Sequence, residues 1–230
     1  MDVSDGEENG DEAELRPVRW LLQAFEWLYT QALEGIPGAE QGIEHLAQSY
    51  RAQYSVDDDA IKALISWQVA KAGVAGFMTN VGGVLTLPVA IPANVVSALY
   101  VQIRMVAAIA HMRGYDLRQD HVRTFVFACL AGSAAFDILK DAGIKVGTQL
   151  TRKMILRISG ELLRQINRTV GFRLVTKAGS RGVINLVKVI PVVSGFVGGG
   201  LDAAFTKAIA NTAKQMFVEH DKLNEDPPTI

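Results

Sequence analysis

Hydrophobic residues recur three and four positions apart along most of the chain, which is the spacing of an amphipathic helix. The first such run starts at Leu15, and its apolar positions are Trp20, Leu21, Ala24, Phe25 and Leu28. The segment Gly35-Ile-Pro-Gly38 is expected to end this helix, because proline has no amide hydrogen and glycine tolerates a positive φ. No stretch alternates between apolar and polar residues over a useful length. The pattern therefore predicts an all-α protein, a multi-helix bundle.

The same pattern places further helices along the chain, separated by glycine, proline and polar turns. Three consecutive acids, Asp57, Asp58 and Asp59, precede an apolar run. A helix N-terminus favours negative charge, so we interpret these acids as a helix start and not as a metal site. The other helices are expected at roughly residues 39–52, 92–113, 121–139, 146–170 and 202–220.

A charge-free segment of 32 residues, 72–103, interrupts this pattern. It is long enough for a transmembrane helix, which needs about 20 residues, but glycine and proline break it into shorter pieces. The residues expected to shape this first hairpin are Gly82, Gly83, Pro88 and Pro92. Such a hairpin is either part of the core or a wedge that dips into a bilayer, and the core interpretation is favoured over insertion and over a true span.

A second charge-free segment, 189–201, is also broken by proline and glycine, at Pro191, Gly195 and Gly199. The spacing of four between Gly195 and Gly199 lets helix backbones approach closely. A phosphate-binding loop is the alternative, but neither a Gly-Lys-Ser/Thr motif nor a preceding strand supports it. We therefore expect a second helical hairpin shaped for packing.

Charge is distributed very unevenly, although the formal net charge is only −1. Residues 1–60 carry a net charge of −11, residues 61–220 carry +12, and residues 140–188 alone carry +9. We expect a disordered acidic tail over 1–14, one helical domain over 15–220 and a flexible C-terminal tail over 221–230. The acidic tail and the basic body are expected to bind separate partners, or to bind each other.

The first 14 residues have no basic n-region and no apolar h-region, so we expect a cytoplasmic protein and not a secreted one. Any membrane contact would then come from the folded body. The single cysteine, Cys129, excludes a disulfide framework within one chain. It lies in an apolar run, where we expect a buried side chain.

Three stretches resemble the EcsC family. They are Gly82–Pro92 together with Gln102-Ile-Arg104, then Ile109-Ala-His-Met-Arg-Gly-Tyr-Asp116, and finally Ile190–Ala203. The similarity spans roughly residues 40–220, and the acidic lead lies outside it. The resemblance implies a helical fold and an association with membranes, since the family is named after a protein encoded beside an ABC exporter. It implies no particular chemistry.

Five basic residues form the candidate membrane-binding or anion-binding set: Arg152, Lys153, Arg157, Arg164 and Arg168. They could meet anionic headgroups, or they could form an ordinary solvated helix face. Nucleic acid is disfavoured as a partner, because no aromatic residues are interleaved with the basic ones to stack on bases.

The candidate catalytic residues are His111, Asp116 and Asp202, whose imidazole and carboxylate groups suit acid-base chemistry if they converge in space. The alternative is structural, with Asp116 in a turn and Asp202 at a helix start. No cofactor motif and no metal-binding motif is present in the sequence.

The sequence as a whole favours a non-catalytic helical protein, peripheral to the inner face of the cell membrane and accessory to a transport or envelope process. Its expected partner is an anionic membrane surface or a membrane protein, and a homo-oligomer is left open. The alternatives are a hydrolase or metal-dependent enzyme built on the three candidate residues, and a soluble binder of lipid or another apolar ligand.

Overall fold

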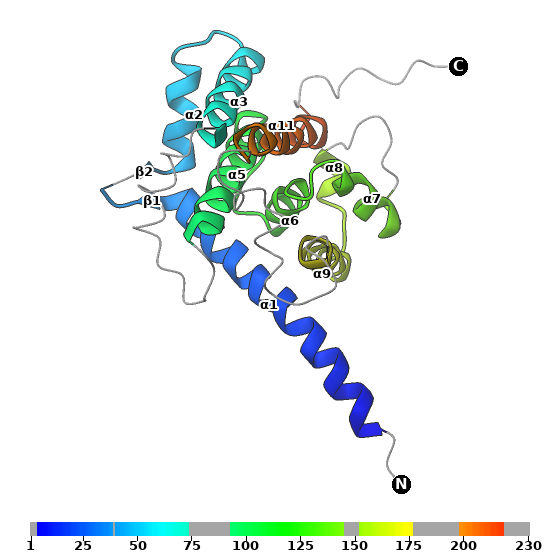
Figure 1. Ribbon diagram of the computed structural model, residues 1–230. Coiled ribbons are helices and arrows are strands. Elements are labelled where there is room, and N and C mark those ends of the chain that lie inside the picture. Colours follow the sequence, from blue (N-terminus) through cyan, green and yellow to red (C-terminus); the bar gives the residue numbers. More distant parts are fainter. Residues whose placement is uncertain (1–3, 39, 74–92, 145–151, 177–197, 219–230) are drawn as a thin grey trace.

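The computed structural model describes residues 4–38, 40–73, 93–144, 152–176 and 198–218, and over these ranges the chain is helical (Figure 1). The predicted all-α class is confirmed. The helices are α1 (Ser4–Glu34), α2 (Ile43–Arg51), α3 (Asp57–Gly73), α5 (Ala93–Met112), α6 (Asp120–Cys129), α7 (Ala134–Asp141), α8 (Arg152–Ile155), α9 (Gly160–Thr176) and α11 (Gly198–Met216). Two short strands, β1 (Gly35–Ile36) and β2 (Glu40–Gln41), pair antiparallel after α1.

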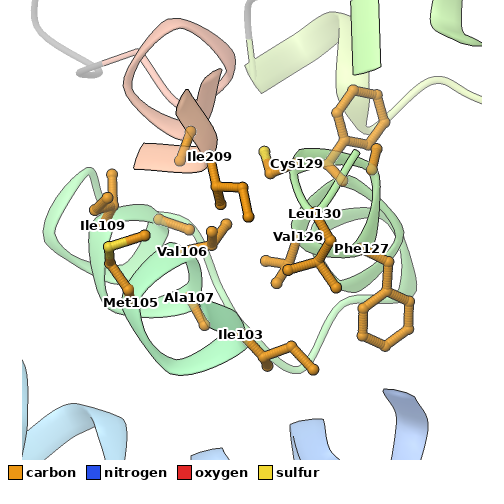
Figure 2. Packing of buried hydrophobic residues seen from close by; sticks show 14 of the residues in the cluster. Ile103, Met105, Val106, Ala107, Ile109, Val126, Phe127, Cys129, Leu130 and Ile209 are labelled. Carbon is orange, nitrogen blue, oxygen red and sulfur yellow. The ribbon is translucent and has the colours of Figure 1, made fainter. Parts of the chain in front are cut away.

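Helix α5 forms the centre of the bundle. Its side chains are buried on every face from Leu99 to Ala110, which is typical of a helix that is apolar all round and lies in a core. It packs against α1, α2, α3, α6 and α11. Figure 2 shows the side chains of α5 packed against those of α6 and α11. Val106 of α5, Val126 of α6 and Ile209 of α11 are among the buried residues of this core.

The burial of α5 tests the core interpretation of the charge-free segment 72–103 only for those of its residues that the structure describes. Residues 96–103 lie in the core or at its edge, as the core interpretation predicted. Residues 74–92, which include Gly82, Gly83, Pro88 and Pro92, lie outside the described residues. Among the helices that the structure describes, none combines the length and apolar character needed to cross a membrane.

Helix α1 begins at Ser4, so the start predicted at Leu15 is eleven residues too late. Its N-terminal part extends away from the other helices, whereas its C-terminal part packs on them (Figure 1). Phe25 and Tyr29 pack on Phe127 of α6, with ring centroids 5.4 and 5.7 Å away. As predicted, α1 ends before Gly35, which adopts φ +86°. The division of the chain into tails and one domain stays a prediction.

Helix α9 crosses α1 at a point where there is no room for a side chain. A Cβ atom built on Gly171 of α9 would lie 2.8 Å from Cγ1 of Val18 and 3.5 Å from Cγ of Leu22. Carbon atoms in ordinary contact are about 3.5–4.0 Å apart. The absence of a side chain at Gly171 therefore sets the close approach of these two helices.

The three acids predicted at a helix start occupy the first turn of α3. Each of them forms an ion pair with a basic residue, two of which belong to other helices or their ends. The pairs are Arg51 with Asp57 (2.8 Å), Arg113 with Asp58, and Lys62 with Asp59 (2.8 Å).

The helix predicted over 121–139 is wrong as a single element, because it breaks between α6 and α7. Residues 127–132 tighten into turns with bonds between residues three apart, and Gly132 adopts φ +61°. A residue with a Cβ rarely adopts this conformation. Gly132 followed by Ser133 was the signal for the break.

The helix predicted over 146–170 is also wrong as a single element. The chain turns after α8, and a new helix begins at Gly160, where Ser159 Oγ accepts a hydrogen bond from the backbone N–H of Leu162 (3.3 Å). This bond is the usual N-cap interaction. The imidazole Nε2 of His121 also lies 2.9 Å from the carbonyl oxygen of Ile158. The basic residues expected on one helix are consequently divided between α8, the turn and α9.

Candidate functional site

A cleft of about 740 Å³ lies where α1 and α5 end beside α2. Most of the residues that line it are polar or charged. They come from the end of α1, from α2, and from the end of α5 with the turn that follows it. The lining residues are Thr30, Leu33, Glu34, Glu44, Arg51, His111, Gly114, Tyr115, Asp116, Leu117 and Arg118.

The way in which α5 ends shapes one wall of the cleft. The N–H of Tyr115 bonds to the carbonyl of Ala110 (3.0 Å), and the N–H of Gly114 bonds to that of His111 (2.9 Å). These two bonds form a Schellman motif, which requires a left-handed residue at its C′ position. Gly114 supplies it with φ +81°. The chain thus reverses directly after His111 and brings Asp116 to the same cleft.

Two residues beside Gly114, Arg113 and Tyr115, have a structural role. The side chain of Arg113 is only 7% exposed and pairs with Asp58 at the start of α3. The ring of Tyr115 packs edge-on against Phe217 at the end of α11, with the centroids 5.0 Å apart. Burial raises the pKa of the Tyr115 hydroxyl, so it stays protonated at neutral pH. Arg113 and Tyr115 therefore tie the end of α5 to two neighbouring helices.

Arg51 lines the cleft, but its guanidinium already has partners. It donates two 2.8 Å hydrogen bonds to the carboxylate of Asp57 and one of 2.7 Å to the carbonyl oxygen of Met112. The bonds to Asp57 raise the pKa of Arg51. This arginine joins α2, α3 and the end of α5, and its charge is largely balanced by Asp57.

The other polar and charged side chains of the cleft have fewer hydrogen-bond and ion-pair partners than Arg51. Asp116 Oδ1 accepts a 3.0 Å bond from the backbone N–H of Arg118, which fixes the turn. Within the part of the chain that the structure describes, the side chains of Glu34, Glu44, His111 and Arg118 form no hydrogen bond or ion pair. These groups are available to a ligand.

The three predicted catalytic residues are only partly brought together. His111, half-buried, and Asp116, exposed, line the same cleft. Asp202 lies near the start of α11, which begins at Gly198 and not at Asp202 as predicted, and its side chain lies outside the described residues. An imidazole and a carboxylate in one cleft can exchange protons with a bound molecule.

Four charged residues of the cleft were missed by the sequence analysis, namely Glu34, Glu44, Arg51 and Arg118. They are spread over 85 positions of the chain, and only the packing of α1, α2 and α5 brings them together. The described residues contain no group of three or more acidic, histidine or cysteine side chains able to hold a metal ion.

The predicted basic residues that are described lie at the surface. Lys153, Arg157, Arg164 and Arg168 are exposed, and Arg152 is half-buried. Three large apolar side chains of the same segment are exposed as well: Met154 (38%), Leu156 (36%) and Phe172 (48%). We call these eight residues the α8–α9 surface.

The second hairpin was predicted to be shaped for packing by Pro191, Gly195 and Gly199. Pro191 and Gly195 lie outside the described residues, and Gly199 lies in the first turn of α11. Their role in helix packing stays a prediction.

Comparison with known proteins agrees with the motifs quoted above. The chain matches the EcsC protein family over residues 18–218, which is most of its 230 residues. No curated protein and no solved structure matches it. The match contains the whole described bundle from Val18 onward, with the cleft and the α8–α9 surface. The chain is therefore a member of the EcsC protein family.

Proposed function

We propose that this protein binds peripherally to an anionic membrane surface through its α8–α9 surface. The observation that carries the proposal is the coincidence of exposed basic and exposed apolar side chains in one segment. Half of the large apolar side chains exposed in the described part of the chain lie between residues 154 and 172. Amphipathic segments that lie on membranes combine these two kinds of side chain.

Helix α9 has the geometry for such a contact. Arg164, Arg168 and Phe172 are spaced four residues apart, so they follow one side of the helix. Ile166 and Val170, on the other side, are fully buried against the bundle, and α9 packs on α1, α6 and α7. The bundle therefore holds the polar and aromatic side outward.

The local charge also favours an anionic surface. Arg173, the next basic residue of α9, pairs with Asp141 of α7 (3.1 Å), whereas Glu161 is the sole acid within α9. Basic residues near an anionic membrane contribute about 1 kcal/mol each. Arg164 and Arg168, which follow one side of α9, would together contribute about 2 kcal/mol, roughly 30-fold in affinity.

The same charge rule favours the inner face of the cell membrane, since the cytoplasmic leaflet carries the negative surface potential. We include in this proposal a role accessory to transport or to the envelope, for which membership of the EcsC family is the support. A membrane protein with an acidic surface is the alternative partner, and the experiment below distinguishes it from lipid.

Flotation of the full chain with protein-free vesicles tests the proposal. The protein should float with vesicles rich in phosphatidylglycerol and stay behind with pure phosphatidylcholine, and salt should weaken its binding. The variant R164Q/R168Q should bind about 30-fold more weakly, because it loses two contributions of about 1 kcal/mol. The variant F172S should also bind less, at any salt concentration.

The matched control is K140Q/K207Q, which removes two exposed lysines outside the α8–α9 surface. Equal weakening by the control and by R164Q/R168Q would show that only net charge matters, and would reject the surface. Failure to float with either vesicle would reject lipid binding. Binding to native membranes but not to protein-free vesicles would assign the surface to a membrane protein.

A further inference from the structure

The cleft at the ends of α1 and α5 has no part in the proposed membrane contact. Its volume of about 740 Å³ is within the range of pockets that hold small molecules. Glu34, Glu44, His111 and Arg118 have no polar partner within the described part of the chain, although all four line the same space. Glu34, Glu44 and Arg118 are exposed to solvent and His111 is half-buried, so a ligand can reach all four. Carboxylates and a guanidinium that line one cavity without pairing with one another are suited to a charged ligand.

The balance of charge indicates which sign the ligand carries. Arg51 is neutralised by Asp57, which leaves the carboxylates of Glu34, Glu44 and Asp116 opposed by the single guanidinium of Arg118. The cleft therefore favours a ligand with more positive than negative charge. One negative group on that ligand would match Arg118, which suits the planar geometry of a carboxylate.

The backbone contributes partial charges of both signs. Helix α1 ends at Glu34, so a helix C-terminus, which carries a partial negative charge and favours cations, lies at the cleft. The last turn of α1 contains no basic side chain that would offset this charge. The last carbonyl groups of α5 already accept bonds from Gly114, Tyr115 and Arg51, and the first turn of α2 places a partial positive charge beside Glu44. The charged side chains therefore decide the preference of the cleft.

We propose that this cleft binds a basic amino acid, or a short peptide ending in one, with its ammonium or guanidinium groups on Glu34 and Glu44 and its carboxylate on Arg118. Asp116 and His111 complete the wall. The site takes no part in lipid binding and is independent of the proposed function.

Isothermal titration of the full chain with defined amino acids tests the proposal. L-arginine and L-lysine should bind. L-norleucine, which has the shape of lysine without the ε-ammonium, should bind at least ten-fold more weakly, because it leaves a carboxylate without its partner. L-glutamate should not bind. Absence of binding by arginine and lysine, or equal binding of glutamate, would overturn the proposal.

Variants test separately the residues that contact the cationic groups of the ligand and the residue that contacts its carboxylate. E34Q/E44Q should weaken L-arginine binding at least ten-fold. R118Q should weaken L-arginine binding but leave agmatine, which is arginine without the carboxylate, unaffected. D137N, which neutralises an exposed acid on α7 outside the cleft, is the control and should change neither affinity.

Circular dichroism of each variant checks whether it keeps its helices. If D137N lost as much affinity for L-arginine as E34Q/E44Q, the assignment of the two glutamates would be contradicted. If R118Q lost as much affinity for agmatine as for L-arginine, the assignment of Arg118 to the carboxylate would be contradicted. Vesicle flotation should be unchanged in all three variants, so failure of this proposal and failure of membrane binding are distinguishable.

Discussion

The crossing of α1 and α9 allows a test of the fold in which the sign of a stability change depends on one neighbouring side chain. Replacing Gly171 by alanine adds a Cβ atom that would lie 2.8 Å from Cγ1 of Val18. Both residues are buried. The new methyl group has no empty space to enter, so Val18 or the helices must move by several tenths of an ångström.

Two opposing effects set the size of the change. Alanine is favoured over glycine within a helix by about 1 kcal/mol, whereas overpacking a core typically costs about 1–3 kcal/mol. We therefore expect Gly171→Ala to lower the free energy of unfolding by about 1 kcal/mol. In a Val18→Ala background the clashing Cγ1 atom is gone, and the same substitution should raise the free energy of unfolding by about 0.5–1 kcal/mol.

Urea unfolding of the four proteins in this double-mutant cycle, followed by far-UV circular dichroism, measures both values. Gly160→Ala is the control in the same helix, because nothing lies within 4 Å of its added Cβ atom. It should not destabilise the protein. If Gly171→Ala stabilised the wild type as much as it stabilises the Val18→Ala background, the described contact between α1 and α9 would be wrong.

Two further substitutions test the electrostatics of the bundle. Asp58→Asn removes the charge that pairs with the buried guanidinium of Arg113, and should lower the free energy of unfolding by about 1–3 kcal/mol in urea titrations. Asp59→Asn, which affects an exposed pair, should have no measurable effect, and equal effects would contradict the burial of Arg113. Partial burial raises the pKa of Glu26, against the opposing effect of Arg123. The Glu26 carboxyl therefore holds its proton more in the folded protein than in the unfolded chain between its ordinary pKa and its raised one, so wild-type stability should fall relative to Glu26→Gln as the pH rises through this range. A stability difference that stays constant or moves the other way would refute this.

Local sequence signals were sufficient wherever a turn is made by its own residues. The end of α1 before Gly35, the acidic start of α3 and the end of α5 before Gly114 follow from the conformational freedom of glycine and from the helix dipole. The breaks at Gly132 and Ser159 were missed because apolar spacing continues through them. The turn signals were present there but were outweighed by the periodicity.

The cleft was only half predictable, for a different reason. His111 and Asp116 lie in one short motif, so the sequence could place them near each other. Glu34 and Glu44 come from α1 and α2, and their position depends on how those helices pack on α5. No spacing within the sequence encodes that packing, since it results from buried side chains distributed over the whole chain.

The enclosure of α5 by five other helices determines how the molecule can come apart. An amide in the middle of this helix cannot reach solvent by fraying of one end or by displacement of one neighbour, because other helices still cover it. Hydrogen exchange at residues such as Val106 should therefore proceed only through global opening and be among the slowest in the chain. A ligand that binds only the folded cleft at the end of α5 would slow this exchange by the same factor by which it stabilises the protein.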